Sequence, residues 1–376
     1  MHDAKEKILS FPASHQTRMG AERVAVVMPN PLGDIAMATP ALRALRRGRP
    51  DAEITLVVRR PMAPLLEEGQ FHDHLLAHDI YAEPSAWRRL VARRRIGRQL
   101  RGFDSVIVLP NSWSGALLAW LSGARERIGY ARRRRDVLLT QAVPAPREQG
   151  RFTPVAMERY YLDLVRAIGC PDVGTQTELS VSRESLERCD ALFLEFGIRS
   201  GAPLVCFAPG AGFGPSKVWP VEYAAQLASA LINDGCQIAL VHGPGEEALA
   251  EVILSGTQGR AFSLGGEALT LDLLKAVLSR ADLLVCNDAG ARHIATAFDV
   301  PALVLVGPTS IAYTNLNLKK TKLLREPVDC SPCHLKVCPI DHRCMTRLLP
   351  ERVLAEARAA LRDPAWKGDV ELELNT

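Results

Sequence analysis

A glycine-rich stretch, FAPGAGFGPSKVWP at residues 207–220, places a lysine where it can meet an anion. Its glycines let the backbone approach a ligand closely. Lys217 stands just before a predicted helix that begins near Pro220, and helix N-termini attract negative charge. We therefore expect Lys217 to bind a diphosphate. The alternative is a plain connection with a solvent-exposed lysine; a Walker A loop is excluded, because its Gly-Lys-Ser/Thr ending is missing.

A second turn, NDAGARH at residues 287–293, follows a predicted strand and opens a helix. Asp288 is expected to cap this helix, so that the N–H groups of residues 289–291 point at an incoming phosphate. His293 lies one turn further on and is placed to donate to a phosphate oxygen. A lone histidine is often structural, so the spacing alone leaves the role of His293 open.

Between these turns, HGPGEE at residues 242–247 ends a strand and starts another helix. Glu246 and Glu247 either complement the dipole of that helix or bind ribose hydroxyls, as acidic groups do in many nucleotide-binding folds.

The first strand of the chain leads into a different kind of turn, MPNPLGD, which ends in Asp34. A carboxylate there would repel a pyrophosphate. The turn also lacks the G-x-G-x-x-G pattern of dinucleotide-binding oxidoreductases, which argues against that class of enzyme.

Four of the nine cysteines fall within CSPCHLKVCPIDHRC, residues 330–344. In a chain expected in the cytoplasm, this density favours a metal over disulfides. Four thiolates suit a structural zinc or iron ion, although the spacing matches no standard zinc finger, and reduced thiols and disulfides stay open. The predicted ligands are Cys330, Cys333, Cys338 and Cys344.

Predicted strands and helices alternate in two series, which indicates an α/β fold with two doubly wound parallel sheets. A polar break, RSGAPL at 199–204, separates the series, so the linker is expected between about 175 and 202. The predicted organisation is a loose tail at 1–20, a first domain at 21–190, a second at 200–328, a cysteine-rich segment at 329–346, and a terminal helix and tail at 347–376.

Arginines are clustered, with seven in residues 87–101 and four at 132–135, while the net charge is only +4. They form either solvated surfaces or a site for an anionic partner, and the lack of interleaved aromatic residues argues against single-stranded nucleic acid. The sequence shows no apolar run of membrane-spanning length and no signal-peptide pattern, so we expect a cytoplasmic protein.

LGDIAMATPALRAL, LPNSWSGALLAW, FAPGAGFGPSKVWP and NDAGARHIATAFDVPALVLVGPT occur in this order between about residues 22 and 310. Together they resemble glycosyltransferase family 9, the ADP-heptose:lipopolysaccharide heptosyltransferases, and are most similar to the heptosyltransferase II branch. The resemblance implies a GT-B fold, in which two Rossmann-like domains face each other across a cleft. It also implies an inverting transfer of heptose from ADP-heptose to the lipopolysaccharide inner core, without a catalytic metal.

The resemblance also assigns roles to residues. It makes Asp34 the catalytic base and places the acceptor on the first domain. The residues that it implies for the donor are Gly212 and Phe213 through their backbone, Lys217, Glu246, Asp288, Ala289, Gly290, Ala291 and His293.

For the acceptor, a lipid A core with phosphates and carboxylates, we expect contacts from Arg59, Arg60, Arg132 and Arg133, because arginine forks suit such groups. The enzyme would then work at the inner membrane surface, with peripheral contact through the arginine clusters. The alternatives are another nucleotide-sugar donor, a protein acceptor, or a nucleotide-sugar-binding protein without catalysis.

Overall fold

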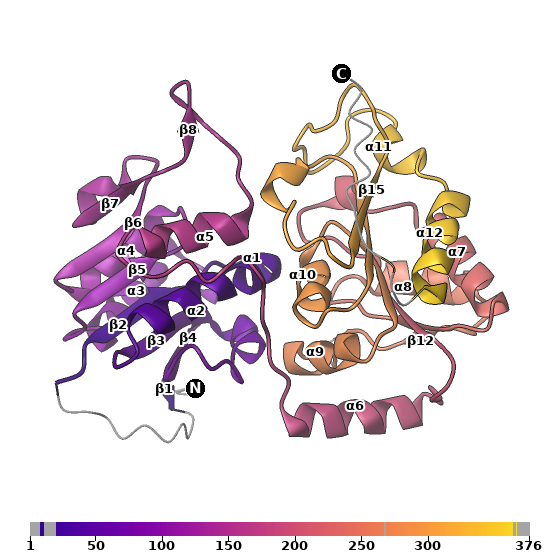
Figure 1. Cartoon of the computed structure of the whole chain (residues 1–376), viewed down its shortest axis with the longest axis horizontal. Helices are drawn as coiled ribbons and strands as arrows, with labels where there is room; N and C mark the ends of the chain where they lie inside the picture. The colour runs from indigo at the N-terminus through magenta and orange to yellow at the C-terminus, as the bar shows by residue number, and fades with distance from the viewer. Residues whose placement is uncertain (1–7, 11–19, 267, 364–365, 367–376) are drawn as a thin grey trace. The chain divides into compact units, whose positions relative to one another are not determined.

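The structure is a computed structural model that describes residues 8–10, 20–266, 268–363 and 366. The chain divides into two compact units, Met1–Thr177 and Glu178–Thr376. Each is built around a twisted, mainly parallel sheet with helices on both faces (Figure 1), which confirms the predicted α/β fold. Within the described residues, no helix has the length and apolar character needed to cross a membrane.

The sheet of the N-terminal unit has the order β1-β4-β3-β2-β5-β6-β7. All its neighbouring strands are parallel except β1, which runs antiparallel to β4. The strands are β1 (Ile8–Ser10), β2 (Arg23–Val27), β3 (Glu53–Arg59), β4 (His74–His78), β5 (Ser105–Val108), β6 (Glu126–Ala131) and β7 (Gln141–Pro144), followed by a small hairpin of β8 (Arg147–Glu148) and β9 (Arg151–Phe152).

Alternate residues of the central strands point to opposite faces of this sheet, and both faces are buried. Ala25, Val27 and Val106 belong to the core under α3 and α4, which meet closely at Gly97: a Cβ there would lie 2.8 Å from the Cβ of Leu121. The helices of this unit are α1 (Leu32–Met37), α2 (Thr39–Gly48), α3 (Ala86–Gln99), α4 (Trp113–Ser122) and α5 (Met157–Arg166), with short 3-10 turns η1 (Arg60–Leu65), η2 (Ile80–Ala82) and η3 (Arg135–Leu138).

The sheet of the C-terminal unit is parallel throughout, in the order β12-β11-β10-β13-β14-β15. Its strands are β10 (Leu204–Ala208), β11 (Gln237–Leu240), β12 (Phe262–Ser263), β13 (Leu283–Asn287), β14 (Ala302–Val306) and β15 (Thr321–Arg325). Its helices are α6 (Arg183–Glu195), α7 (Val221–Asn233), α8 (Glu247–Gly256), α9 (Leu271–Ser279), α10 (Gly290–Ala297), α11 (Arg343–Thr346) and α12 (Pro350–Arg362), with 3-10 turns η4 (Pro215–Lys217) and η5 (Ile311–Tyr313).

One face of this second sheet carries a continuous apolar core. Phe207, Leu240 and Val285 contribute to it from the strands, and buried residues of α7, α8 and α12 pack against them. Burying such aliphatic and aromatic side chains supplies most of the stability of the unit, at about 1.5–3 kcal/mol for each large one.

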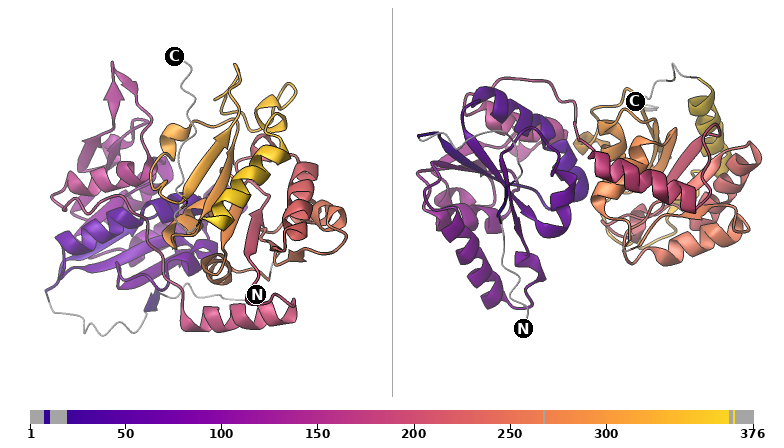
Figure 2. Two further views of the ribbon diagram at one scale, coloured as in Figure 1. Left: turned by 45° about the vertical axis from the view of Figure 1, so that its right-hand side comes forward. Right: turned by 90° about the horizontal axis from the view of Figure 1, so that it is seen from below.

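The boundary between the units lies earlier than expected. We predicted a first domain up to residue 190 and a linker up to about 202, but the first unit ends at Thr177 and α6 belongs to the second. The reason is a polar contact with α9: Asp272 accepts hydrogen bonds from the Ser185 hydroxyl at 3.2 Å and from Arg188 at 2.8 Å. Figure 2 shows α6 against the C-terminal unit from two sides.

Local differences from the prediction have local causes. The sequence pattern predicts one helix over residues 36–47, but the helix is interrupted at Ala38, because Pro40 has no N–H to continue the ladder of α1 into α2. The pattern also predicts a helix over residues 151–169, and the structure confines it to Met157–Arg166. Most of the predicted loose tail, 1–20, lies outside the described residues, but its residues 8–10 form β1 instead of a tail.

Candidate functional site

The order of strands in the C-terminal unit reverses between β10 and β13, which are hydrogen-bonded neighbours. In doubly wound sheets, the crevice outside the carboxyl ends of two such strands is where ligands bind. The turn after β10 carries Lys217, and the turn after β13 carries Asp288 and His293. The topology therefore brings the two predicted anion-binding turns together.

Lys217 and Asp288 form a largely buried ion pair at this point. The Nζ of Lys217 lies 2.7 Å from Oδ2 of Asp288 and 2.8 Å from its main-chain oxygen, and the Thr309 hydroxyl donates to the same Oδ2 at 2.8 Å. Burial alone would raise the pKa of Asp288, but the charge and hydrogen bonds of Lys217 and the bond from Thr309 lower it. The carboxylate is thus held ionised and fixes the lysine in the crevice.

Asn287 ties the same two turns together through its buried side-chain amide. Its Nδ2 donates to the Pro209 oxygen at 2.6 Å, and its Oδ1 accepts from the Trp219 N–H at 3.1 Å. These bonds span both ends of the loop that carries Lys217. Asn287 opens the NDAGARH motif, but its sequence position alone gave no sign of this role.

The start of α10 differs from the prediction. Ala289, not Asp288, occupies the N-cap position, and no side chain caps the helix, because the Asp288 carboxylate is committed to Lys217 and Thr309. The N–H groups of Ala289, Gly290 and Ala291 therefore open the helix with no capping side chain, as an anion site requires.

His293 is buried inside α10 and lies in positive surroundings. Burial and the charges of Arg292 and Lys217 lower its pKa, although the charge of Asp288 opposes them. The imidazole is therefore neutral near pH 7 and acts as an uncharged group with one N–H donor.

The carboxylate of Glu246 lies against the turn after β10. Its Oε2 accepts from the Gly243 N–H at 3.0 Å, and a Cβ on Gly210 would lie only 1.8 Å from Oε1. Gly210 is thus a glycine because the acid occupies that space. Glu247 is exposed, and hydrogen bonds from its own N–H and that of Gly245 lower its pKa. The structure therefore places Glu246, not Glu247, beside the loop of Lys217.

Gly212, which is exposed, and Phe213, which is partly buried, lie in the same loop. The ring centroid of Phe213 lies 5.2 Å from the Nζ of Lys217, a cation–π distance. Within the described residues, no protein acceptor takes a hydrogen bond from either backbone N–H. The predicted role of these two N–H groups as donors to a ligand stays a prediction.

Asp34 lies in the N-terminal unit, in the first turn of α1, which follows β2. The strand order of this first sheet reverses between β2 and its neighbour β5. The hydroxyl of Tyr161, on α5, donates to Oδ1 of Asp34 at 3.0 Å. Burial, with the charge of Asp34 and this hydrogen bond, raises the pKa of Tyr161 well above its usual value. Tyr161 is therefore a fixed neutral donor to the predicted base.

The carboxyl edge of the same sheet also carries the predicted acceptor arginines. The guanidinium of Arg59 lies 5.6 Å from the ring centroid of Tyr81, and that of Arg132 lies 3.7 Å from the ring of Phe152. Arg60 is paired with Asp79 at 2.5 Å. The exposed Arg133 offers its main-chain oxygen to the indole N–H of Trp113 at 2.8 Å.

Arg135 corrects the view of residues 132–135 as one surface cluster, because its side chain is fully buried. It donates to the main-chain oxygens of Tyr130, Pro110 and Ser112. Burial lowers its pKa to about 10, so it stays charged and serves the fold, not an external ligand.

The four clustered cysteines lie in a segment that we call the cysteine segment, Cys330–Cys344. Cys333 is exposed and Cys344 is buried. Burial and the nearby thiols of Cys330, Cys338 and Cys333 raise the pKa of Cys344 to about 11. In the part of the chain that the structure describes, no three or more His, Cys, Asp or Glu side chains are arranged to hold a metal ion.

A family model described as "Glycosyltransferase family 9 (heptosyltransferase)" matches residues 93–343, which is more than half of the chain. The chain belongs to glycosyltransferase family 9. It is therefore a glycosyltransferase, and the family predicted from the sequence is confirmed.

Among the relatives of this family 9 enzyme is "Lipopolysaccharide heptosyltransferase 2" of Salmonella typhimurium, which is 29% identical in an alignment of 362 residues that covers 91% of this chain and 99% of the relative. The solved structure of E. coli ADP-heptose lps heptosyltransferase II matches with a TM-score of 0.74 and 26% identity, covering 90% of this chain and 98% of that one. E. coli heptosyltransferase WaaC with ADP-2-deoxy-2-fluoro heptose shares the fold, at a TM-score of 0.67 and 20% identity.

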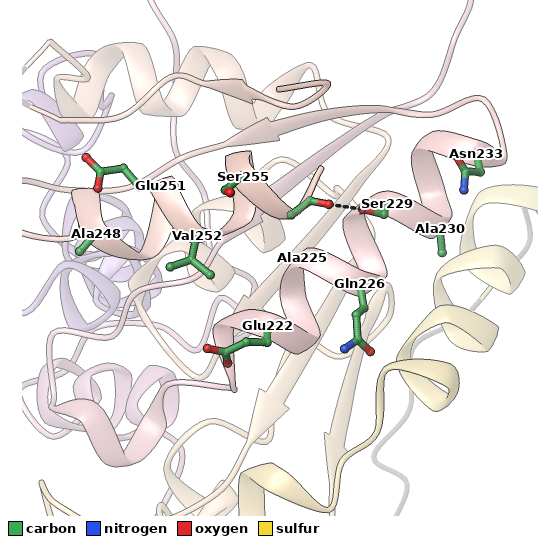
Figure 3. A pocket seen from close by; sticks show the side chains of 11 residues that line it. Glu222, Ala225, Gln226, Ser229, Ala230, Asn233, Ala248, Glu251, Val252 and Ser255 are labelled. Carbon is green, nitrogen blue, oxygen red and sulfur yellow. Dashed lines mark hydrogen bonds between the residues drawn. The ribbon is translucent and has the colours of Figure 1, made fainter. Parts of the chain in front are cut away.

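A large hollow of the family 9 enzyme lies elsewhere, between α7 and α8 (Figure 3). Glu222, Gln226 and Ser229 line it from α7, and Glu251 and Val252 from α8. None of its lining residues is a predicted site residue, and it lacks convergent cations. Its size alone therefore does not make it the donor site.

Proposed function

We propose that the enzyme transfers heptose from ADP-heptose to the inner core of lipopolysaccharide, with inversion at the anomeric carbon. This donor and this acceptor are those in the names of similar proteins, lipopolysaccharide heptosyltransferase 2 and ADP-heptose lps heptosyltransferase II. The observation that carries the proposal is the Lys217–Asp288 pair at the strand-order reversal. Folds of this kind bind nucleotides at that position, and the pair holds the lysine ammonium group there, where it can contact a diphosphate.

In this proposal, the leaving ADP is stabilised by three groups of the C-terminal unit. Lys217 supplies an ammonium group that stays paired with Asp288, the N–H groups at the start of α10 supply hydrogen bonds, and neutral His293 supplies one more donor. Glu246 accepts hydrogen bonds from ribose hydroxyls. These groups are held before the substrate arrives, so they need little reorganisation as charge develops on the diphosphate.

Asp34 is proposed to act as general base. As the acceptor oxygen forms its bond to the anomeric carbon, its proton passes to the Asp34 carboxylate, and the bond from that carbon to the diphosphate oxygen breaks with its electron pair leaving on ADP. Tyr161 donates to Oδ1, which orients the carboxylate for this step.

The test is ADP release from ADP-heptose with deacylated core acceptors of defined heptose number. We expect release only with acceptors that carry the inner-core sugar. Nucleotide release from a different nucleotide sugar would show that ADP-heptose is not the donor. Transfer to a protein would show that the lipopolysaccharide core is not the acceptor. Tight ADP-heptose binding without turnover on any acceptor would instead identify a non-catalytic binding protein.

We also propose that the enzyme is cytoplasmic and contacts the inner membrane surface through one face of α3. Trp87 is 68% exposed and Val91 is 40% exposed on this face. Four arginines share the exposed face: Arg88, Arg94, Arg95 and Arg98. Among the described residues, none of the four has a carboxylate within ion-pair distance, and the sequence of α3 contains no acid.

An exposed tryptophan beside unpaired arginines suits an anionic bilayer, where each basic residue near the surface contributes about 1 kcal/mol. Sedimentation with phosphatidylcholine vesicles, with and without phosphatidylglycerol, tests the proposal. The triple variant Arg94→Glu, Arg95→Glu, Arg98→Glu should lose binding to anionic vesicles. A matched variant with Arg199, Lys319 and Arg362 changed to Glu, in the other unit, should keep it; equal binding by both variants would refute the α3 assignment.

We also propose that the cysteine segment is a structural metal site, because Cys330 and Cys333 have the C-x2-C spacing of metal ligands. The described thiols do not form a ligand group as they stand, so no step of the reaction is assigned to a metal. Metal analysis of protein purified without a chelator decides the matter: stoichiometric zinc or iron would support the site, and its absence would rule it out. In either case we expect transfer activity to survive brief treatment with EDTA.

A further inference from the structure

The cysteine segment is hydrogen-bonded to the turn that carries Lys217. Ser216, the residue before the lysine, is buried and uses all its polar groups on this segment. Its N–H donates to the Lys336 oxygen at 3.1 Å, and its hydroxyl donates to the Leu335 oxygen at 2.5 Å. Its own main-chain oxygen accepts from Nε2 of His342 at 2.7 Å.

The two backbones also touch at Gly214. A Cβ on Gly214 would lie 2.6 Å from the Lys336 oxygen, and its φ of +152° lies in the region that glycine adopts most readily. The cysteine segment therefore packs directly on η4, with no room for a side chain between them.

The other end of the segment binds the turn after β14. The Ser331 hydroxyl donates to the Gly307 oxygen at 2.7 Å, and the His334 N–H donates to the Pro308 oxygen at 2.8 Å. The next residue in that turn is Thr309, which donates to Asp288. One segment thus holds both turns that position the Lys217–Asp288 pair.

We infer that the cysteine segment is a positioning element of the donor site, and that His342 acts on Lys217 through Ser216. The inference rests on the proposed function, in which Lys217 binds the diphosphate. Without the His342 bond, the oxygen of Ser216 would be buried without this donor, and η4 would be free to relax away from the crevice. The segment therefore sets donor affinity without touching the donor.

The experiment measures ADP binding by calorimetry, together with the Michaelis constants of donor and acceptor. His342→Ala is expected to weaken ADP binding and raise the donor KM about three- to tenfold, the effect of losing one buried hydrogen bond. The acceptor KM should not change. His342→Gln, which keeps an N–H donor, should restore most of the affinity.

Val337→Ala is the matched control, because the side chain of Val337 is 66% exposed and none of the bonds described above involves this residue. It should bind ADP as the unaltered enzyme does. If His342→Ala does not fold, Ser216→Ala removes the hydroxyl bond to Leu335 and should weaken ADP binding in the same way.

Normal ADP affinity in folded His342→Ala or Ser216→Ala would overturn the inference and leave the proposed function intact. An equal rise in the KM of donor and acceptor would show a general structural role and would also overturn it. If the unaltered enzyme binds no ADP, the proposed donor site itself fails, which is a distinguishable result.

Discussion

The hydroxyl of Tyr161 donates to Oδ1 of Asp34 at 3.0 Å, across 127 residues of sequence. Because burial and the neighbouring carboxylate raise the pKa of Tyr161, the phenol keeps its proton throughout the working range of the enzyme. Tyr161 therefore stays a neutral hydrogen-bond donor to the carboxylate, and Asp34 is the only one of the two that can accept a proton.

Removing this donor should slow transfer without abolishing it. Tyr161→Phe should lower kcat about tenfold, because a hydrogen bond to a charged group is lost and the carboxylate can rotate. Asp34→Asn should lower kcat by about 10²- to 10⁴-fold, the range of a lost general base. Steady-state kinetics with donor in excess measures both, and an active Asp34→Asn enzyme with intact fold would refute the assigned base.

Lys217 should matter for donor binding and for the chemical step. Lys217→Gln removes the charge that faces the diphosphate, so kcat/KM should fall about 10²- to 10³-fold and ADP should bind more weakly. Lys319→Gln is the control, since it removes an exposed lysine of the same unit. If the two variants lose activity equally, the lysine has no special role.

The arginines at 132–135 should separate into two classes. Arg132→Gln with Arg133→Gln should raise the KM of the acceptor several-fold and leave that of ADP-heptose unchanged. Arg135→Gln should instead lower the free energy of unfolding by about 1–3 kcal/mol, because buried main-chain oxygens lose their donor. Kinetics and urea unfolding distinguish these outcomes; a raised donor KM in the double variant would contradict the acceptor assignment.

Acid should destabilise the N-terminal unit through His72 and His78. Burial lowers the pKa of each to about 4, from 6.5 in the unfolded chain. Between these values the unfolded chain binds more protons, so the free energy of unfolding falls as the pH drops from 6.5 towards 4, by up to about 1.4 kcal/mol per pH unit for each histidine. Urea unfolding at several pH values should show a shallower loss for the His72→Gln, His78→Gln variant than for the unaltered chain.

Much of the fold was predictable, because apolar runs such as Leu204–Ala208 are bounded by glycines, prolines and helix signals. The sequence pattern predicts strands at 24–28, 54–58 and 105–109 in the first unit and at 204–208, 237–242, 261–263, 283–286 and 302–306 in the second. It misses the hairpin of β8 and β9, and it misses β1, β4, β6, β7 and β15, which lie in the outer positions of their sheets. Their sequences mix charged or polar residues with short apolar pairs, as in Thr321–Arg325, so no local pattern separates them from loops.

The site was predictable only where its chemistry is local in sequence. Lys217, Asp288 and His293 belong to short motifs that follow predicted strands, so their approach at the carboxyl edge of the second sheet was expected. Tyr161 was missed because its partner lies on another element, and a tyrosine in an amphipathic helix resembles ordinary core. Arg135 was misjudged because a run of four arginines gives no sign of which one turns inward.

The cysteine segment also has a consequence for how the chain matures. Ser216 is made early, but two of its partners, Leu335 and Lys336, are synthesised about 120 residues later. The buried residues of α11 and α12, which help to close the apolar core of the same unit, are made later still. The C-terminal sheet and the turn that carries Lys217 therefore gain their last contacts together, only when translation is almost complete.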